Sequence, residues 1–173
     1  MRFGVKIGTP NIVGANLEFV LPALDNHLAI FADYSGFTVD IDEVDTSLKY
    51  IEFGTNIYFN NSGKGLYGSL SYGKLDIEGS YSDAQTIEGE NFTGDAYGEL
   101  DVSTVNVKLG IKFGDMFYFR SELGFGFGDV PEQIEISGNV NGSPETGIED
   151  IPDVPGIGES GYALFNIGIG ISF

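Results

Sequence analysis

Apolar and polar side chains alternate along most of this chain with a period of two residues, which is typical of strands that separate two environments. The clearest example is residues 101–114, where one face is apolar and the other polar or small: Val105, Val107, Leu109, Ile111 and Phe113 against Thr104, Asn106, Lys108, Gly110 and Lys112. The same pattern predicts eight strands, over residues 2–9, 15–21, 27–39, 47–59, 65–79, 101–114, 117–128 and 161–173. No segment of the sequence has a convincing helical period.

The predicted connections alternate in character. Residues 22–26, 60–64 and 114–116 form short turns rich in Gly, Asn, Asp or Pro. Residues 40–46 read as an acidic loop, and the polar stretches around residues 80–100 and 129–160 read as long loops. An even number of strands places both termini on the rim with the short turns. This rim asymmetry is typical of bacterial outer-membrane barrels.

The last predicted strand carries the most specific motif. Its apolar face ends in a bare aromatic residue, and consists of Ala163, Phe165, Ile167, Ile169, Ile171 and Phe173. Here the sequence resembles bacterial outer-membrane β-barrels, whose last strand ends in Phe, preceded by apolar residues at two, four and six positions and an aromatic at the eighth. Phe173, Ile171, Ile169, Ile167 and Phe165 match that pattern residue for residue.

The resemblance implies an all-β fold: an eight-stranded, antiparallel, up-and-down transmembrane barrel, similar to the small OmpX- and OmpA-type barrels. It also implies that the barrel-assembly machinery reads the terminal motif, and that outer-membrane lipid surrounds the barrel. Soluble barrels such as lipocalins share the strand number, but here the outward faces are almost exclusively Phe, Ile, Leu and Val, an aggregation liability in water. We therefore expect a single domain, residues 1–173, monomeric, in a bacterial outer membrane with both termini periplasmic.

Met1 leads directly into the first strand without a basic segment followed by a long apolar one. Given the barrel interpretation, we expect a mature chain whose export signal has been removed.

The inward faces of the predicted strands collect charges of both signs. They comprise Lys6, Glu18, Asp33, Glu52, Lys108, Lys112, Arg120 and Glu122. These could line an ion path or a substrate site. The interpretation we favour is a paired polar core, because the interior of an eight-stranded barrel is only wide enough for side chains, and unpaired buried charge is very costly.

Inward glycines gather on three neighbouring predicted strands: Gly4 and Gly8, then Gly124, Gly126 and Gly128, then Gly168 and Gly170. This bare wall could border a ligand groove. We favour the interpretation that it makes room for large inward side chains, namely Tyr50, Tyr58, Tyr67 and Arg120.

The predicted long loops are strongly acidic. The formal net charge is −18, which argues against nucleic acid as a partner, and the absence of Cys excludes disulfides and thiolate metal sites. Most acidic residues fall in the predicted long-loop rim, with no Lys or Arg between Lys74 and Lys108 or after Arg120. These loops can be read as a solvated coat or as sites for Ca²⁺, since hard cations prefer several oxygen ligands. Asp40, Asp42 and Asp45 are the densest cluster and our first choice of ligands.

Function is less determined than fold. We expect a non-enzymatic surface protein with a closed lumen, whose acidic loops serve adhesion, other surface interactions or envelope structure. The alternatives are a narrow channel or small-ligand transporter, and a lipid-modifying enzyme. His27, the only histidine, lies beside a short turn on the rim opposite to where membrane-barrel lipases carry their Ser/His pair, so we expect no catalytic residues and no cofactor besides the cation.

Overall fold

The structure, a computed structural model, describes residues 1–41, 44–60, 63–81, 96–140, 143–150 and 156–173. Eight of its strands form one ring, and their bounds are β1 (Arg2–Thr9), β2 (Ile12–Val20), β3 (Leu28–Ile41), β4 (Val44–Tyr58), β5 (Gly65–Tyr81), β6 (Ala96–Gly114), β7 (Phe117–Phe127) and β11 (Gly161–Ser172). Each pairs antiparallel with the next, and β11 pairs with both β7 and β1. The predicted eight-stranded antiparallel barrel is confirmed.

The barrel closes between the two ends of the chain. Arg2 pairs with Ser172, and the register runs without interruption to Thr9 opposite Phe165. At the rim, the backbone N–H of Phe173 donates to the carbonyl of Met1 at 2.8 Å, and the amino group of Met1 donates to the carbonyl of Phe173 at 3.1 Å. No edge strand is therefore left open at the seam.

The outer surface of the barrel carries an apolar belt of exposed side chains. Outward positions around the ring include Val5 on β1, Leu17 on β2, Phe53 on β4, Val107 on β6 and Ile169 on β11, each at least two-fifths exposed. A surface of this kind is stable in the hydrocarbon of a bilayer and a liability in water. Among the described residues, none belongs to a helix long and apolar enough to cross a membrane.

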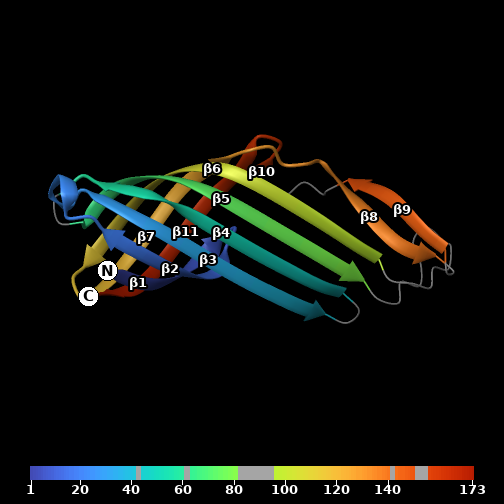
Figure 1. Cartoon of the computed structure of the whole chain (residues 1–173), viewed down its shortest axis with the longest axis horizontal. Helices are drawn as coiled ribbons and strands as arrows, with labels where there is room; N and C mark the ends of the chain where they lie inside the picture. Colours follow the sequence, from blue (N-terminus) through green and yellow to red (C-terminus); the bar gives the residue numbers. More distant parts are fainter. Residues whose placement is uncertain (42–43, 61–62, 82–95, 141–142, 151–155) are drawn as a thin grey trace.

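Half of the barrel is much taller than the other half. Strands β3, β4, β5 and β6 have 14, 15, 17 and 19 residues, whereas β1, β2, β7 and β11 have 8, 9, 11 and 12. A tilted strand crosses a bilayer with about 9–11 residues. In Figure 1 the termini lie together at one end, and β3–β6 continue past the short strands toward the opposite end.

Two predicted loops are wrong in part because strands extend into them. β3 continues to Ile41 and β4 begins at Val44, so most of the predicted loop at residues 40–46 is strand. Likewise, β5 reaches Tyr81 and β6 begins at Ala96, within the predicted loop at residues 80–100. The long strands thus form an extension of the sheet beyond the barrel.

The predicted loop at residues 129–160 is also corrected, because it contains three further strands: β8 (Gln133–Val140), β9 (Ser143–Asp150) and β10 (Ile157–Gly158). β8 and β9 form a hairpin that joins the extension through β6, where Gly98 pairs with Ile136. The hairpin lies at the far end of the molecule in Figure 1. It pairs with residues 96–98 of β6 and so covers the tip of the edge that β6 exposes beyond the end of β7.

Candidate functional site

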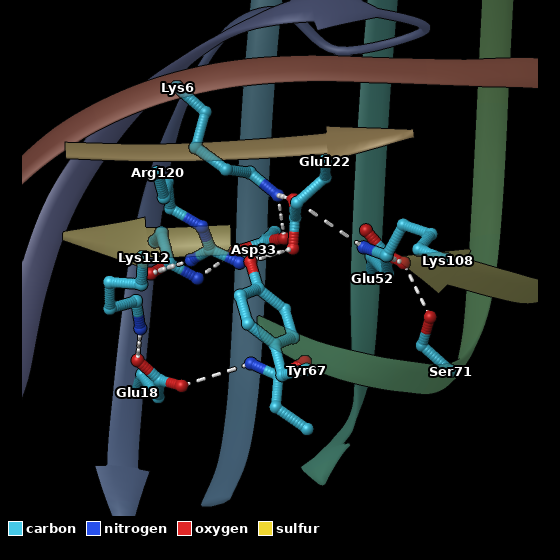
Figure 2. Close-up of polar contacts among 12 residues, drawn as sticks. Lys6, Glu18, Asp33, Glu52, Tyr67, Ser71, Lys108, Lys112, Arg120 and Glu122 are labelled. Carbon is cyan, nitrogen blue, oxygen red and sulfur yellow. Dashed lines mark hydrogen bonds and ion pairs between the residues drawn. The ribbon is translucent and has the colours of Figure 1, made fainter. Parts of the chain in front are cut away.

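All eight charged side chains predicted to face inward lie inside the barrel. They are at most 3% exposed, and they come from six of the eight strands: Lys6, Glu18, Asp33, Glu52, Lys108, Lys112, Arg120 and Glu122. The alternation explains this placement, because each occupies the same face of its strand as the buried polar residues around it. The structure brings the eight together in two adjacent groups of ion pairs, which we call the network (Figure 2).

Glu122 on β7 is the centre of the larger part of this network. Its carboxylate pairs with Arg120, lies 3.4 Å from Lys6 Nζ and 3.9 Å from Lys108 Nζ, and accepts a hydrogen bond from the Tyr67 hydroxyl at 2.9 Å. Both carboxylate oxygens therefore have partners. Removing this one carboxylate would leave three buried cations with fewer counter-charges.

Two further carboxylates extend the network along the lumen. Lys108 Nζ lies 2.6 Å from Glu52 Oε1, and Glu52 also accepts a hydrogen bond from Asn106 at 3.1 Å. Asp33 pairs with Lys6 and accepts a hydrogen bond from Asn16. The chain of pairs runs without a break from Asp33 through Lys6, Glu122 and Lys108 to Glu52.

Glu18 organises the part of the network nearer the terminal rim. Its carboxylate pairs with Lys112, and accepts hydrogen bonds from Asn56 at 3.0 Å and from the Tyr58 hydroxyl. Arg2, 7% exposed, approaches it at 3.4 Å. Arg2 was not among the predicted lumen charges, although it lies on the same face of β1 as Lys6.

Aromatic rings stabilise the cation of this second group. Lys112 Nζ lies 5.3 Å from the ring centroid of Tyr58, 5.7 Å from that of Tyr67 and 5.0 Å from that of Tyr118. The negative faces of aromatic rings attract cations at such distances. The rings also fill the lumen with side-chain volume.

An apolar cluster covers the network on the side away from the termini. Its buried members are Tyr50, Leu75, Val102, Tyr162 and Leu164, with Leu48, Ile77, Leu100 and Val130 packed against them. The hydroxyl of Tyr50 accepts a hydrogen bond from Asn106 at 2.9 Å, which ties the cluster to the polar layer below. This apolar layer, which we call the outer cap, packs inside the barrel against the polar network.

Glycines make room for the large inward side chains, as expected, but with different partners in part. A side chain at Gly168 would meet Arg120, whereas Tyr50 and Tyr67 lie against Gly73 and Gly110, outside the predicted glycine wall. The wall residues Gly4 and Gly170 instead face Tyr118, which the prediction did not include. The ring of Tyr58 packs on that of Tyr67 with centroids 5.0 Å apart.

The polarity of the sheet inverts where β3–β6 leave the barrel. Within the belt the outward residues are apolar and the inward ones polar, but in the extension Leu75, Ile77 and Val102 face inward while the outward face is acidic. On that outward face Glu78 lies directly opposite Glu99, and carboxylates in directly opposed positions repel each other. Asp76 lies opposite Asp101, and Lys74 Nζ lies 2.6 Å from Asp76 and 3.4 Å from Asp101.

The predicted cation ligands fall on this acidic face only in part. Asp40 and Asp45 are directly opposite each other on β3 and β4, while Asp42 lies outside the described residues. A side-chain hydrogen bond with Asp40, together with its charge, raises the pKa of Asp45 above the ordinary value. In the part of the chain that the structure describes, no group of three or more His, Cys, Asp or Glu side chains is arranged to hold a metal ion.

His27 lies on the terminal rim, directly after the 3₁₀ turn η1 (Ala23–Asn26). Its Nδ1 lies 2.6 Å from the carbonyl oxygen of Tyr58, and the backbone N–H of Tyr58 donates to the carbonyl of His27 at 2.7 Å. These contacts anchor the η1 turn to the end of β4.

Comparison with known proteins finds similarity in fold. No protein-family model and no curated protein sequence matches the chain. The crystal structure of CarO from Acinetobacter baumannii is similar over 99% of this chain and 97% of that chain, with a TM-score of 0.55 and 10% sequence identity. A major outer membrane protein from Thermus thermophilus is similar over 99% of both chains, with a TM-score of 0.50 and 10% identity. At this identity the likeness concerns the fold, which is that of small outer-membrane β-barrels.

Proposed function

We propose that this protein is a non-enzymatic component of the outer membrane, in which a closed barrel anchors an acidic sheet outside the cell. Both termini would face the periplasm. The acidic outward face of β3–β6 would make contacts with other anionic surfaces through divalent cations. The observation that carries the proposal is the inversion of polarity along these four strands.

The inversion supports a position for the end of the hydrocarbon layer. The outward positions change from Ile51 to Lys49 along β4, from Tyr72 to Lys74 along β5, and from Val105 to Asp101 along β6. Charged side chains on the lipid face of a barrel strand are destabilising near the middle of the bilayer. The acidic rows therefore belong in water beyond the membrane, on the side away from the termini.

The opposed carboxylates favour cation-mediated contacts over an inert coat. Asp40 and Asp45, and Glu78 and Glu99, occupy paired positions on neighbouring strands, in a chain of net charge −18. Hard divalent cations bind several carboxylate oxygens, and would relieve the repulsion within each pair. The raised pKa of Asp45 has a related cause, because a proton bound there forms a hydrogen bond with Asp40 and removes the repulsion between the two carboxylates. A cation should thus compete with that proton, so its effect should weaken as the pH falls into the acidic range.

Thermal unfolding with and without calcium tests this proposal. Millimolar calcium should raise the melting temperature of the folded protein by a few degrees more than sodium at equal ionic strength. In the double variants Asp40→Asn/Asp45→Asn and Glu78→Gln/Glu99→Gln, this extra rise in melting temperature with calcium should be smaller than in the wild type. Proteoliposomes carrying the wild type should also bind vesicles of anionic phospholipid in calcium, and those carrying the variants should bind less.

The matched control is Asp25→Asn/Asp115→Asn, which removes the same charge from exposed positions on the terminal rim. It should leave the calcium increment and the vesicle binding unchanged. Equal stabilisation by sodium and calcium would mean that the acids are only a charged coat, contrary to the proposal.

A narrow channel is the second candidate, because polar and charged side chains line the lumen between the terminal rim and the outer cap. The ion pairs and the outer cap oppose it. Electrical conductance of the pure protein distinguishes the two candidates.

A further inference from the structure

The apolar belt is hollowed beside the rim where the two termini meet. The hollow has a volume of about 740 Å³ and lies over β1, β11, β7 and the end of β6. Its walls include Phe3, Phe113, Phe117 and Phe119, with Val5 and Ile169 between them. We call it the belt groove. Its volume lies within the range of roughly 300–1,000 Å³ that is usual for ligand sites.

The strand register explains how the groove is built. Phe3, Ile171 and Phe117 lie side by side in one row of outward residues, and Val5, Ile169 and Phe119 in the row two residues further from the rim. Between these rows lie Gly4 and Gly170, paired with each other, whose missing side chains would point into the lumen against Tyr118. The outer side of this middle row is therefore backbone, which forms a floor between walls of large rings.

The lining is suited to a hydrocarbon chain. Among the described residues, no charged side chain lines the groove, and the only polar one, the hydroxyl of Tyr118, is packed inside the barrel against Gly4 and Gly170. Phe113 and Phe117 are more than half exposed, so their rings stand out from the wall. An occupant would make dispersion contacts with both walls and the floor, more than a flat stretch of the belt allows.

We propose that the belt groove holds one acyl chain of a phospholipid, as a bound lipid rather than as part of the freely exchanging bilayer. The proposal rests on the membrane placement given above, which puts the terminal rim in the periplasm and the groove in the adjacent, periplasmic leaflet. The groove is continuous with the lipid-facing belt, so acyl chains are the groups that surround it. Packing decides the preference, because inside a bilayer apolar surfaces gain nothing from leaving water.

Native mass spectrometry of the purified protein tests this directly. The folded protein would be freed of lipid in detergent and titrated with a dioleoyl phosphatidylethanolamine. We expect the wild type to bind a single lipid before any others. Val5→Trp places a large ring in the groove and should weaken that first binding roughly tenfold, since a chain makes many small contacts there.

The matched control is Val107→Trp, the same change at a lipid-facing valine of β6 that does not line the groove. It should bind the first lipid as the wild type does. Phe117→Ala, which lowers one wall without adding volume, should also weaken the binding. Heat-modifiable migration on gels would show that each variant is a folded barrel, so that loss of lipid is separated from loss of the membrane fold.

Three results would overturn the inference. The first is a gradual series of bound lipids on the wild type, with no preferred first molecule. The second is a first lipid bound as tightly by Val5→Trp as by Val107→Trp. The third is a mass of two chains that Val5→Trp abolishes, which would show that a second copy of the protein, and not a lipid, occupies the groove.

Discussion

Replacing Glu52 with alanine should lower the free energy of unfolding by about 3 kcal/mol. The reason is Lys108, whose ammonium lies 2.6 Å from Glu52 and is buried, with Glu122 as its other carboxylate neighbour at 3.9 Å. Asn106 would also lose an acceptor. Arg120→Ala should cost a similar amount, because it removes the arginine partner of the buried Glu122 carboxylate and the donor to the side-chain oxygen of Asn16.

The measurement is chemical denaturation of the protein folded in lipid vesicles, followed by heat-modifiable migration on gels. Glu99→Ala is the control, since it removes an exposed carboxylate from β6, and it should change the unfolding free energy by no more than about 0.5 kcal/mol. The double variant Glu52→Leu/Lys108→Met should recover most of the loss, because apolar residues of similar volume often replace a buried pair without destabilisation. A loss below about 1 kcal/mol for Glu52→Ala would mean that the network is not a set of buried pairs.

Deleting Phe173 should reduce the amount of protein inserted in the outer membrane of cells severalfold. The terminal motif of Phe165, Ile167, Ile169, Ile171 and Phe173 resembles the one that barrel-assembly machinery reads in outer-membrane barrels. In the folded barrel Phe173 is 77% exposed and contributes little packing, and its backbone hydrogen bonds with Met1 lie at the very end of the β1–β11 seam, which keeps its eight residue pairs without them. The defect should therefore appear in assembly and not in the stability of the finished protein.

Quantifying folded protein in isolated outer membranes, against total protein made, checks this expectation. Phe127→Ala removes another exposed aromatic, from the end of β7, and should insert normally. The purified deletion variant, refolded in detergent, should unfold at the same denaturant concentration as the wild type. Normal insertion of the deletion variant would count against a role for Phe173 in assembly.

The sequence predicted the barrel because its belt strands keep a strict alternation. Val105 to Phe113 on β6 is the clearest case, and the pairing of β1 with β11 follows from ring closure. It predicted the extension only in part, reaching residue 79 of β5 but starting β6 at residue 101 instead of Ala96. On β6 the two faces exchange character there: Leu100 and Val102 face inward while Glu99 and Asp101 face outward, so the apolar outward residues that define the predicted strand end near residue 101.

The β8–β9 hairpin was missed for a different reason. Its contact with the barrel sheet is three residue pairs on β6, formed with a segment about forty residues away in the sequence. On β8, Ile134 and Ile136 alternate with Glu135 and Ser137, but this pattern covers only about five residues and does not continue along β9. So short an alternation, between segments rich in Gly, Pro and acidic residues, is a weak strand signal.

The membership of the lumen network was predictable, whereas its pairing was not. Face alternation alone assigns Lys6, Glu18 and Glu122 to the interior. Which cation meets which carboxylate depends on how the sheet curls, and the partners Lys6 and Glu122 lie 116 residues apart. The outer cap and Tyr118 also depend on this curvature, and emerge only in three dimensions.

Electrical recording from planar bilayers tests the closed barrel most directly. The purified protein would be added to one side after heat-modifiable migration has shown that it is folded and inserts in vesicles. Because ion pairs fill the lumen and the outer cap covers them, we expect no stable conductance steps. Steady ohmic channels from the pure wild-type protein would contradict the closed lumen, and would favour the narrow channel instead.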